Sequence, residues 1–270
     1  MKVAVSNIAW EPGDDEKVAD ALRRAGAEAV EVAPTKVWPD PTAVSPAQAH
    51  AYGRAWARAG LPVVAAQSLL YGRPDLTLFG PGREEFVAYL GRIAELGAAL
   101  GATALVFGSP RNRLRQDLPV AVADRIAVDV FGRLAERAVA AGTTFCVEAN
   151  PAVYGADYLT RATEAAALVA AVDSPGLRLH LDTACMTLAG EDPAAGVRRF
   201  APLLRHAHLS EPHLAAVGHP DPRHADFAAA LRAVDYAGHL SVEMRPSDGD
   251  RVAAVERAAR YAVALCGAAA

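Results

Sequence analysis

The chain has 270 residues, 52% hydrophobic and 21% charged, a composition that supplies a large core and excludes global disorder. Its 27 Lys and Arg against 31 Asp and Glu give a formal net charge of −4, with no basic footprint for nucleic acid or an anionic membrane. The three cysteines, Cys146, Cys185 and Cys266, lack the paired spacing of a disulfide scaffold or zinc ribbon. Because no apolar run approaches a membrane span and the first residues resemble a strand more than a signal peptide, we expect a soluble, cytoplasmic protein.

Short apolar runs of β type alternate with longer amphipathic segments along the chain. We expect strands over residues 2–6, 29–33, 62–67, 102–107, 143–148, 177–182, 204–209 and 239–244. Helices are expected over residues 14–25, 46–59, 83–100, 118–141, 156–172, 193–200, 221–234 and 250–265. Eight strand-and-helix units predict an α/β protein with one (β/α)8 TIM barrel domain over residues 1–270. A doubly wound sheet is the competing fold, but SNIAWEPGDD after the first strand lacks the dinucleotide-binding glycine pattern.

The expected helix ends carry recognisable capping residues. Ser45 precedes Pro46, an arrangement typical of a helix start. Four expected helices end at or just before a glycine that favours a left-handed cap. These glycines are Gly26, Gly60, Gly101 and Gly142.

The last four expected strands end in residues that bind divalent metals. They are Glu148 in FCVEANP, Asp182 in LHLDTA, His208 in RHAHLSEP and Glu243 in LSVEMRP. Each is about one strand-and-helix unit from the next, which places all four around one half of the barrel mouth. A single acidic strand end is usually just solvated, but four in succession are poorly explained that way, because unpaired charges there are costly. We predict one divalent metal, Mn²⁺ first, with Co²⁺, Mg²⁺ or Zn²⁺ as alternatives.

These motifs resemble the xylose isomerase-like TIM barrel superfamily, in the sugar phosphate isomerase/epimerase branch related to D-tagatose 3-epimerase. The resemblance covers essentially the whole chain and is most specific in VEANP, LHLDTA, HAHLSEP and SVEMRP. It implies that Glu148, Asp182, His208 and Glu243 bind one metal. It also implies that Glu148 and Glu243 face each other across the substrate as acid and base. The resemblance further implies a small sugar-like substrate and no nucleic acid or membrane partner. It is also compatible with a homo-oligomer.

General chemistry supports this assignment independently. Moving a proton next to a carbonyl needs a base, an acid and stabilisation of an enediolate, which a metal bound to the substrate oxygens provides. We therefore expect a divalent-metal-dependent epimerase or isomerase acting on a sugar, cyclitol or sugar derivative. The sequence does not choose between epimerisation and aldose–ketose isomerisation.

Three alternatives remain open. A metal-dependent dehydratase or lyase of the 3-dehydroshikimate type begins with the same proton abstraction. An endonuclease IV-like DNA repair enzyme is disfavoured, because strands one to four end without the extra histidines and the chain is acidic. A non-catalytic ligand-binding barrel is disfavoured by the complete ligand set.

The remaining polar residues near the expected strand ends are candidates for binding substrate. They are Gln67, Lys36, Arg113, Glu211, His213 and Arg245. Arg113 and Arg245, with Arg73 and Arg111, could form a basic wall for a carboxylate or phosphate, or could pair with local acids.

Departures from the ketohexose epimerases concern the sugar hydroxyls. Cys185, Leu214 and Tyr154 stand where those enzymes have a histidine, an arginine and a second glutamate, which argues against a plain ketohexose. His180 and His206, two residues before metal-ligand positions, are expected inside the barrel.

Overall fold

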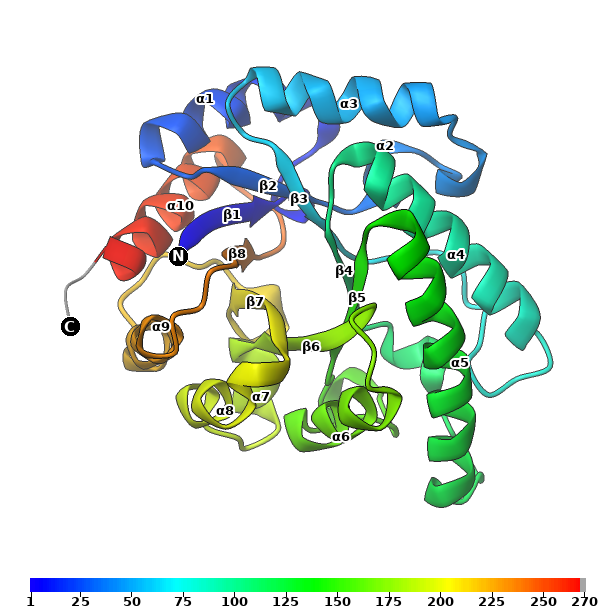
Figure 1. Cartoon of the computed structure of the whole chain (residues 1–270). Coiled ribbons are helices and arrows are strands. Elements are labelled where there is room, and N and C mark those ends of the chain that lie inside the picture. The colour runs from blue at the N-terminus through cyan, green and yellow to red at the C-terminus, as the bar shows by residue number, and fades with distance from the viewer. Residues whose placement is uncertain (268–270) are drawn as a thin grey trace.

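Eight parallel strands form a closed barrel in the computed structural model of the chain, which describes residues 1–267 (Figure 1). The strands are β1 (Lys2–Ser6), β2 (Ala29–Val32), β3 (Val63–Ala66), β4 (Ala104–Phe107), β5 (Thr144–Glu148), β6 (Leu177–Asp182), β7 (Leu204–Ser210) and β8 (His239–Glu243). They follow chain order around the ring, and β8 pairs with β1 to close it. The predicted barrel is confirmed and the open doubly wound sheet is excluded. Residues 268–270 of the predicted domain lie outside the described residues.

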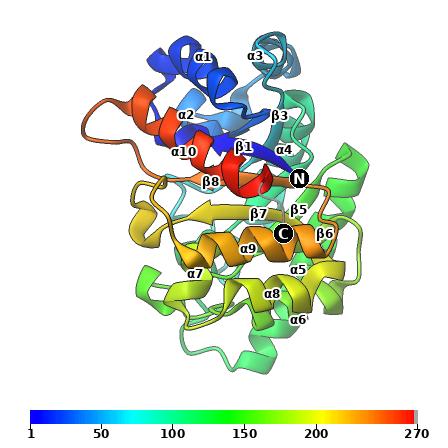
Figure 2. The same ribbon diagram turned by 90° about the vertical axis from the view of Figure 1, so that its left-hand side faces the viewer.

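Helices surround the barrel and connect its strands. The longer ones are α1 (Asp15–Ala25), α3 (Pro46–Arg58), α4 (Arg83–Leu100), α5 (Val120–Ala141), α6 (Ala162–Val172), α8 (Pro193–Phe200), α9 (Pro222–Ala233) and α10 (Arg251–Gly267). Two short helices, α2 (Pro34–Val37) and α7 (Thr183–Leu188), lie at the ends of β2 and β6. Helix α10 packs against α1 where the ring closes (Figure 2). Within residues 1–267, each helix is too short or too polar to cross a bilayer.

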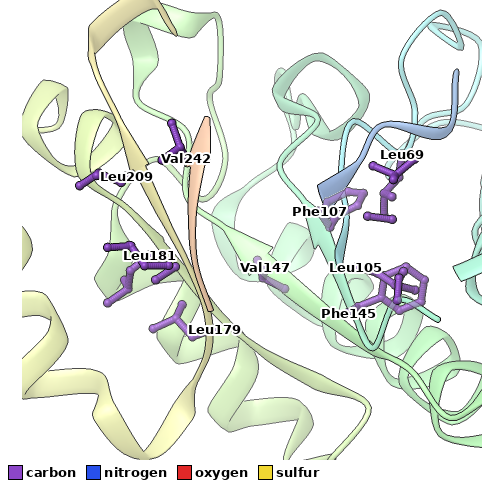
Figure 3. Close-up of a cluster of buried hydrophobic side chains, with 14 of the residues drawn as sticks. Leu69, Leu105, Phe107, Phe145, Val147, Leu179, Leu181, Leu209 and Val242 are labelled. Carbon is purple, nitrogen blue, oxygen red and sulfur yellow. The ribbon is translucent and has the colours of Figure 1, made fainter. Parts of the chain in front are cut away.

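Alternation along the strands separates the apolar core from the polar interior of the barrel. Successive side chains of a strand point to opposite faces. In β6, Leu179 and Leu181 belong to the apolar core, whereas the intervening His180 joins a cluster with Asp182 at the strand end. Leu105 and Phe107 on β4, and Phe145 and Val147 on β5, follow the same rule (Figure 3). The main apolar core therefore lies between strands and helices. The opposite face of the strands carries the polar side chains and a small apolar cluster of Ala65, Ala104 and Cys146.

The expected helix caps are confirmed. The four predicted glycines have φ between +78° and +95°, a left-handed conformation that costs glycine little. Ser45 Oγ accepts a hydrogen bond from the Gln48 N–H, and the Gln48 side chain accepts one from the Ser45 N–H. This reciprocal pair fixes the start of α3.

Element bounds agree with the predicted ones to within two residues, except after β2, β5 and β6. The short helix α2 after β2 was not expected. Helix α6 begins at Ala162, so the prediction that residues 156–161 are helical is wrong. Gly155 and Leu159 have φ of +82° and +53°, which interrupts a right-handed helix. Helix α7 was not expected, and it begins because Asp182 Oδ1 accepts a hydrogen bond from the Cys185 N–H at 2.6 Å.

Two glycine substitutions test the packing of the outer helices. A Cβ at Gly53 in α3 would overlap the Leu100 carbonyl oxygen of α4, so Gly53→Ala should lower the free energy of unfolding by about 1–3 kcal/mol. A Cβ at Gly132 in α5 meets nothing within 4 Å, so Gly132→Ala should raise it by about 0.5–1 kcal/mol. Urea denaturation measures both changes, and equal effects in the two variants would contradict this packing.

Candidate metal centre and substrate pocket

Residues at the carboxyl ends of β5 to β8 converge as predicted on one side of the barrel. Donor atoms of Glu148, His180, Asp182 and His208 all lie within 4.8 Å of one another. The fourth predicted ligand, Glu243, places Oε2 3.4 Å from His208 Nδ1. The four predicted ligands are thus together, and His180 is a neighbour that sequence analysis placed only inside the barrel.

The electrostatics of this cluster call for additional positive charge. Burial, with the nearby carboxylates of Asp182 and Glu243, raises the pKa of Glu148 to about 8. Burial and Glu243 likewise raise the pKa of Asp182. Burial opposes protonation of His208, yet Glu31 and Glu243 hold its pKa well above the usual value. Three carboxylates this close repel one another unless a cation lies among them.

An orphaned nitrogen tests whether the residues fit a divalent ion. Among the described residues, buried His208 Nδ1 has no hydrogen-bond partner, and it lies 3.4 Å from Glu243 Oε2 and 3.9 Å from Asp182 Oδ2. A mixed set of carboxylate oxygens and one imidazole nitrogen suits Mn²⁺, Co²⁺, Mg²⁺ or Zn²⁺. The donors present therefore fit a single divalent metal.

The Asp182 carboxylate is held by its neighbours on both oxygens. Oδ1 caps α7 through the Cys185 N–H, and Oδ2 accepts a hydrogen bond from Ser210 Oγ at 2.6 Å. Thr183 Oγ1 donates to the Ser210 carbonyl and accepts from its N–H, which ties β6 to β7. Asp182 is consequently rigid before any ligand arrives. Ser210 was not singled out from the sequence, although its position two residues past His208 placed it at the strand end.

The Glu148 carboxylate is oriented by Asn150. Asn150 Nδ2 donates to Glu148 Oε2 at 3.0 Å, and Arg113 Nη2 donates to Asn150 Oδ1 at 3.0 Å. Since the amide oxygen is taken by Arg113, the amide N–H groups must face Glu148. A Cβ at Gly108 would overlap Glu148 Oε2, so the glycine makes room for this carboxylate.

Arg113 lies behind the pocket wall, in contrast to the direct substrate contact expected from the sequence. Its side chain is fully buried. Besides Asn150, its guanidinium donates to the carbonyl oxygens of Gly108, Tyr158 and Leu159. Four of its five N–H groups are therefore engaged, and its complete burial keeps the guanidinium away from a ligand in the pocket. Sequence analysis could not find this role, because the acceptors are mostly backbone atoms far along the chain.

A pocket of about 410 Å³ opens above the metal-type centre. Glu148, Asp182 and Glu243 line it, together with two predicted substrate-binding residues, Gln67 and His213. Gln67 Nε2 donates to Ser6 Oγ at 2.7 Å, which orients its amide. Tyr154, Cys185 and Leu214, the positions that depart from the ketohexose epimerases, also line the pocket.

His213 shapes one wall of the pocket through an unusual backbone conformation. His213 and Leu214 have φ of +60° and +55°, left-handed values that are uncommon for residues other than glycine. The His213 N–H donates to the Tyr154 hydroxyl at 2.8 Å, and the two rings pack edge to face. The strained turn is thus held against the loop after β5.

Three predicted substrate-binding residues do not line this pocket. Lys36 Nζ donates to the Trp10 carbonyl at 2.5 Å. Arg245 is exposed two residues beyond β8. Glu211 faces Arg223 and His224, at 3.6 and 3.7 Å. Two further groups of side chains could hold an ion: Glu31 with His206 and His208, and Glu211 with Asp221 and His224. In the last group, Arg223 already pairs with both carboxylates.

The four arginines do not form a basic wall around the pocket. Arg73 pairs with Asp75 at 2.6 Å and Arg113 is buried. Arg73 and Arg111 border a neighbouring cavity that shares Ser68, Ser109 and Pro110 with the pocket. Among the described residues, those lining the pocket include neither arginine nor lysine. Local pairing, the alternative left open for these arginines, holds for Arg73.

Sequence analysis missed Glu31 altogether. It lies on β2 with no solvent exposure, and its carboxylate is 3.0 Å from His208 Nε2 and 3.3 Å from His206 Nε2. Burial would raise the pKa of Glu31, yet His208 and His206 hold it well below its usual range. The available signal was a glutamate in the middle of the apolar segment AVEVA. His180 and His206 are buried inside the barrel, as expected.

The fold and the site define a (β/α)8 barrel with a metal-type centre at the carboxyl ends of its strands. The chain belongs to the xylose isomerase-like TIM barrel family, whose profile matches residues 19–265. The predicted resemblance is therefore confirmed at the level of the family.

Similar proteins include several epimerases. The chain is 33% identical over 121 residues to L-ribulose 3-epimerase from Mesorhizobium japonicum, a match that spans 44% of this chain and 39% of the relative. A solved structure of L-ribulose 3-epimerase superimposes with a TM-score of 0.82 at 21% identity, covering 98% of this chain and 95% of the other. D-psicose 3-epimerase in the presence of D-fructose gives a TM-score of 0.79 at 19% identity, covering 99% and 100%. At these identities the two structures establish the shared fold.

Replacing Arg113 tests whether it is a structural clamp. Arg113→Met and Arg113→Lys should each lower the free energy of unfolding by about 2–4 kcal/mol, because buried carbonyl oxygens lose their donors. Arg111→Lys, an exposed neighbour in the same turn, should stay within about 0.5 kcal/mol of the original protein. Chemical denaturation measures all three. Unchanged stability in both Arg113 variants would contradict the clamp and restore a direct role toward substrate.

Proposed function

We propose that the chain is a divalent-metal-dependent epimerase or isomerase that moves a proton next to the carbonyl of an uncharged sugar or sugar derivative. The observation that carries this proposal is the convergence of Glu148, Asp182, His208 and Glu243 at a pocket of about 410 Å³. Membership of the xylose isomerase-like family supports it, as does the partial match to an L-ribulose 3-epimerase. Mn²⁺ is the first candidate ion.

Glu148 and Glu243 are proposed as the proton-transfer pair. They come from β5 and β8, and both line the pocket. One takes the proton from the carbon and the other returns it, which inverts the centre if they act on opposite faces. Asn150 keeps Glu148 oriented during the exchange. The bound ion supplies positive charge that lowers the energy of negative charge on the substrate oxygens.

The pocket lining favours a substrate without carboxylate or phosphate. Anion recognition usually relies on arginine or lysine, and the described lining residues contain neither. Gln67 and His213 offer hydrogen-bonding groups suited to hydroxyls instead. The dehydratase of the 3-dehydroshikimate type is correspondingly disfavoured, because its substrate carries a carboxylate.

The first experiment follows deuterium exchange from D₂O into L-ribulose, other free ketoses, inososes and 3-dehydroshikimate. The Mn²⁺-loaded protein should exchange the hydrogen next to the carbonyl of a neutral sugar-type substrate. Glu148→Gln and Glu243→Gln should each abolish turnover while retaining the fold. Glu84→Gln, which removes a surface carboxylate paired with Arg133, serves as the control. Near-normal turnover in Glu243→Gln would remove that residue from the proton-transfer pair.

Metal binding should stabilise the protein measurably. At an ion concentration of 100 times Kd, a ligand that binds only the folded state adds about 2.7 kcal/mol. Chelation should therefore lower the Tm of the original protein and abolish exchange, with recovery when Mn²⁺ is added back. Asp182→Ala should lose the Mn²⁺-dependent increase in Tm. An identical Tm with and without Mn²⁺ across a wide concentration range would contradict the metal-dependent proposal.

A further inference from the structure

A fully buried carboxylate inside the barrel has no part in the proton transfer proposed above. Glu31 projects from β2 toward β7, where its oxygens meet the Nε2 atoms of His206 and His208. An ionised side chain in a protein interior is costly unless it is paired and hydrogen-bonded. In the described residues both of its hydrogen-bond partners are these imidazoles. The role of Glu31 therefore depends on the two histidines that it contacts.

The two ring nitrogens of His208 meet different surroundings. Nε2 lies 3.0 and 3.2 Å from the two oxygens of Glu31. Nδ1 faces Asp182 and Glu243 at the mouth and has no hydrogen-bond partner within residues 1–267. A neutral imidazole carries one proton, and an ionised carboxylate can only accept. Glu31 therefore favours the His208 tautomer with its proton on Nε2. In that tautomer the lone pair on Nδ1 is directed at the carboxylates of Asp182 and Glu243.

We propose that Glu31 is a positioning residue that fixes the tautomer and orientation of His208, so that Nδ1 serves as a metal ligand. This inference rests on the metal centre of the proposed function. A carboxylate that accepts the other N–H of a metal-binding histidine orients the ring and increases its basicity. Glu31 achieves this from β2, on the side of the barrel that contributes none of the four predicted ligands.

His206 supplies an internal comparison for Glu31. It shares the same carboxylate at 3.3 Å, and its ring lies 5.3 Å from that of His208 between centroids. It lies two residues before His208 on β7, and among the described residues Glu31 is the only carboxylate within 4.0 Å of its ring nitrogens, whereas His208 also faces Asp182 and Glu243. If Glu31 acts through His208, removing His206 must affect metal binding less than removing the Glu31 charge.

Calorimetric titration with Mn²⁺ tests this order of effects. Glu31→Gln keeps an acceptor of similar shape without the charge, and should weaken Mn²⁺ binding about 10- to 100-fold. His206→Gln, the matched control in the same network, should lose less affinity than Glu31→Gln. Equal affinity of Glu31→Gln and the original protein overturns the inference. An equal loss in both variants overturns the assignment to His208 in particular.

The second measurement needs no variant and so does not depend on the folding of Glu31→Gln. Nitrogen-15 NMR of histidine-labelled, Zn²⁺-loaded protein should find the His208 proton on Nε2. A proton on Nδ1 overturns the inference. Failure of the original protein to bind any divalent ion would contradict the proposed function itself. Normal binding by the original protein with unchanged affinity in Glu31→Gln contradicts only the role of Glu31.

Discussion

Mutual repulsion among three carboxylates, two buried and one partly buried, is the constraint on which the site depends. Glu148, Asp182 and Glu243 reach the same barrel mouth, and burial removes much of the water that would screen them. Hydrogen bonds donated by Asn150, by Ser210 and by the Cys185 N–H at the start of α7 offset part of this repulsion. These contacts orient the oxygens without adding a charge to the pocket. In the proposed function, a divalent cation would supply the missing charge, and the same charge would favour proton removal beside a carbonyl.

The barrel tolerates this concentration of charge because it separates the charged side chains from the apolar core. Strand alternation sends leucine, valine and phenylalanine outward to the helices, where they form one continuous core. Histidines and carboxylates alternate with them and point into the barrel. Arg113 acts at the edge of this interior, where it ties the loops after β4 and β5 together behind Glu148. Stability and chemistry therefore occupy opposite faces of the same strands.

The fold and the convergence of the four strand-end residues could be predicted because each is encoded locally. Alternating strand and helix periods gave the eight units, and Glu148, Asp182, His208 and Glu243 each stand at a strand end. The pocket wall was less predictable, since side-chain direction in loops depends on distant acceptors. Arg113 illustrates this, because its guanidinium donates hydrogen bonds to three backbone carbonyl oxygens and to the Asn150 side chain. Glu31 was missed because its partners lie on β7, and no local pattern links the two strands.

Anomalous diffraction from crystals grown with Mn²⁺ tests the central claim most directly, because it places the ion as well as detecting it. The account predicts one strong manganese peak per chain, within bonding distance of Glu148, Asp182, His208 Nδ1 and Glu243. A peak at the Glu211, Asp221 and His224 cluster instead, or none in crystals that retain the barrel, would contradict it.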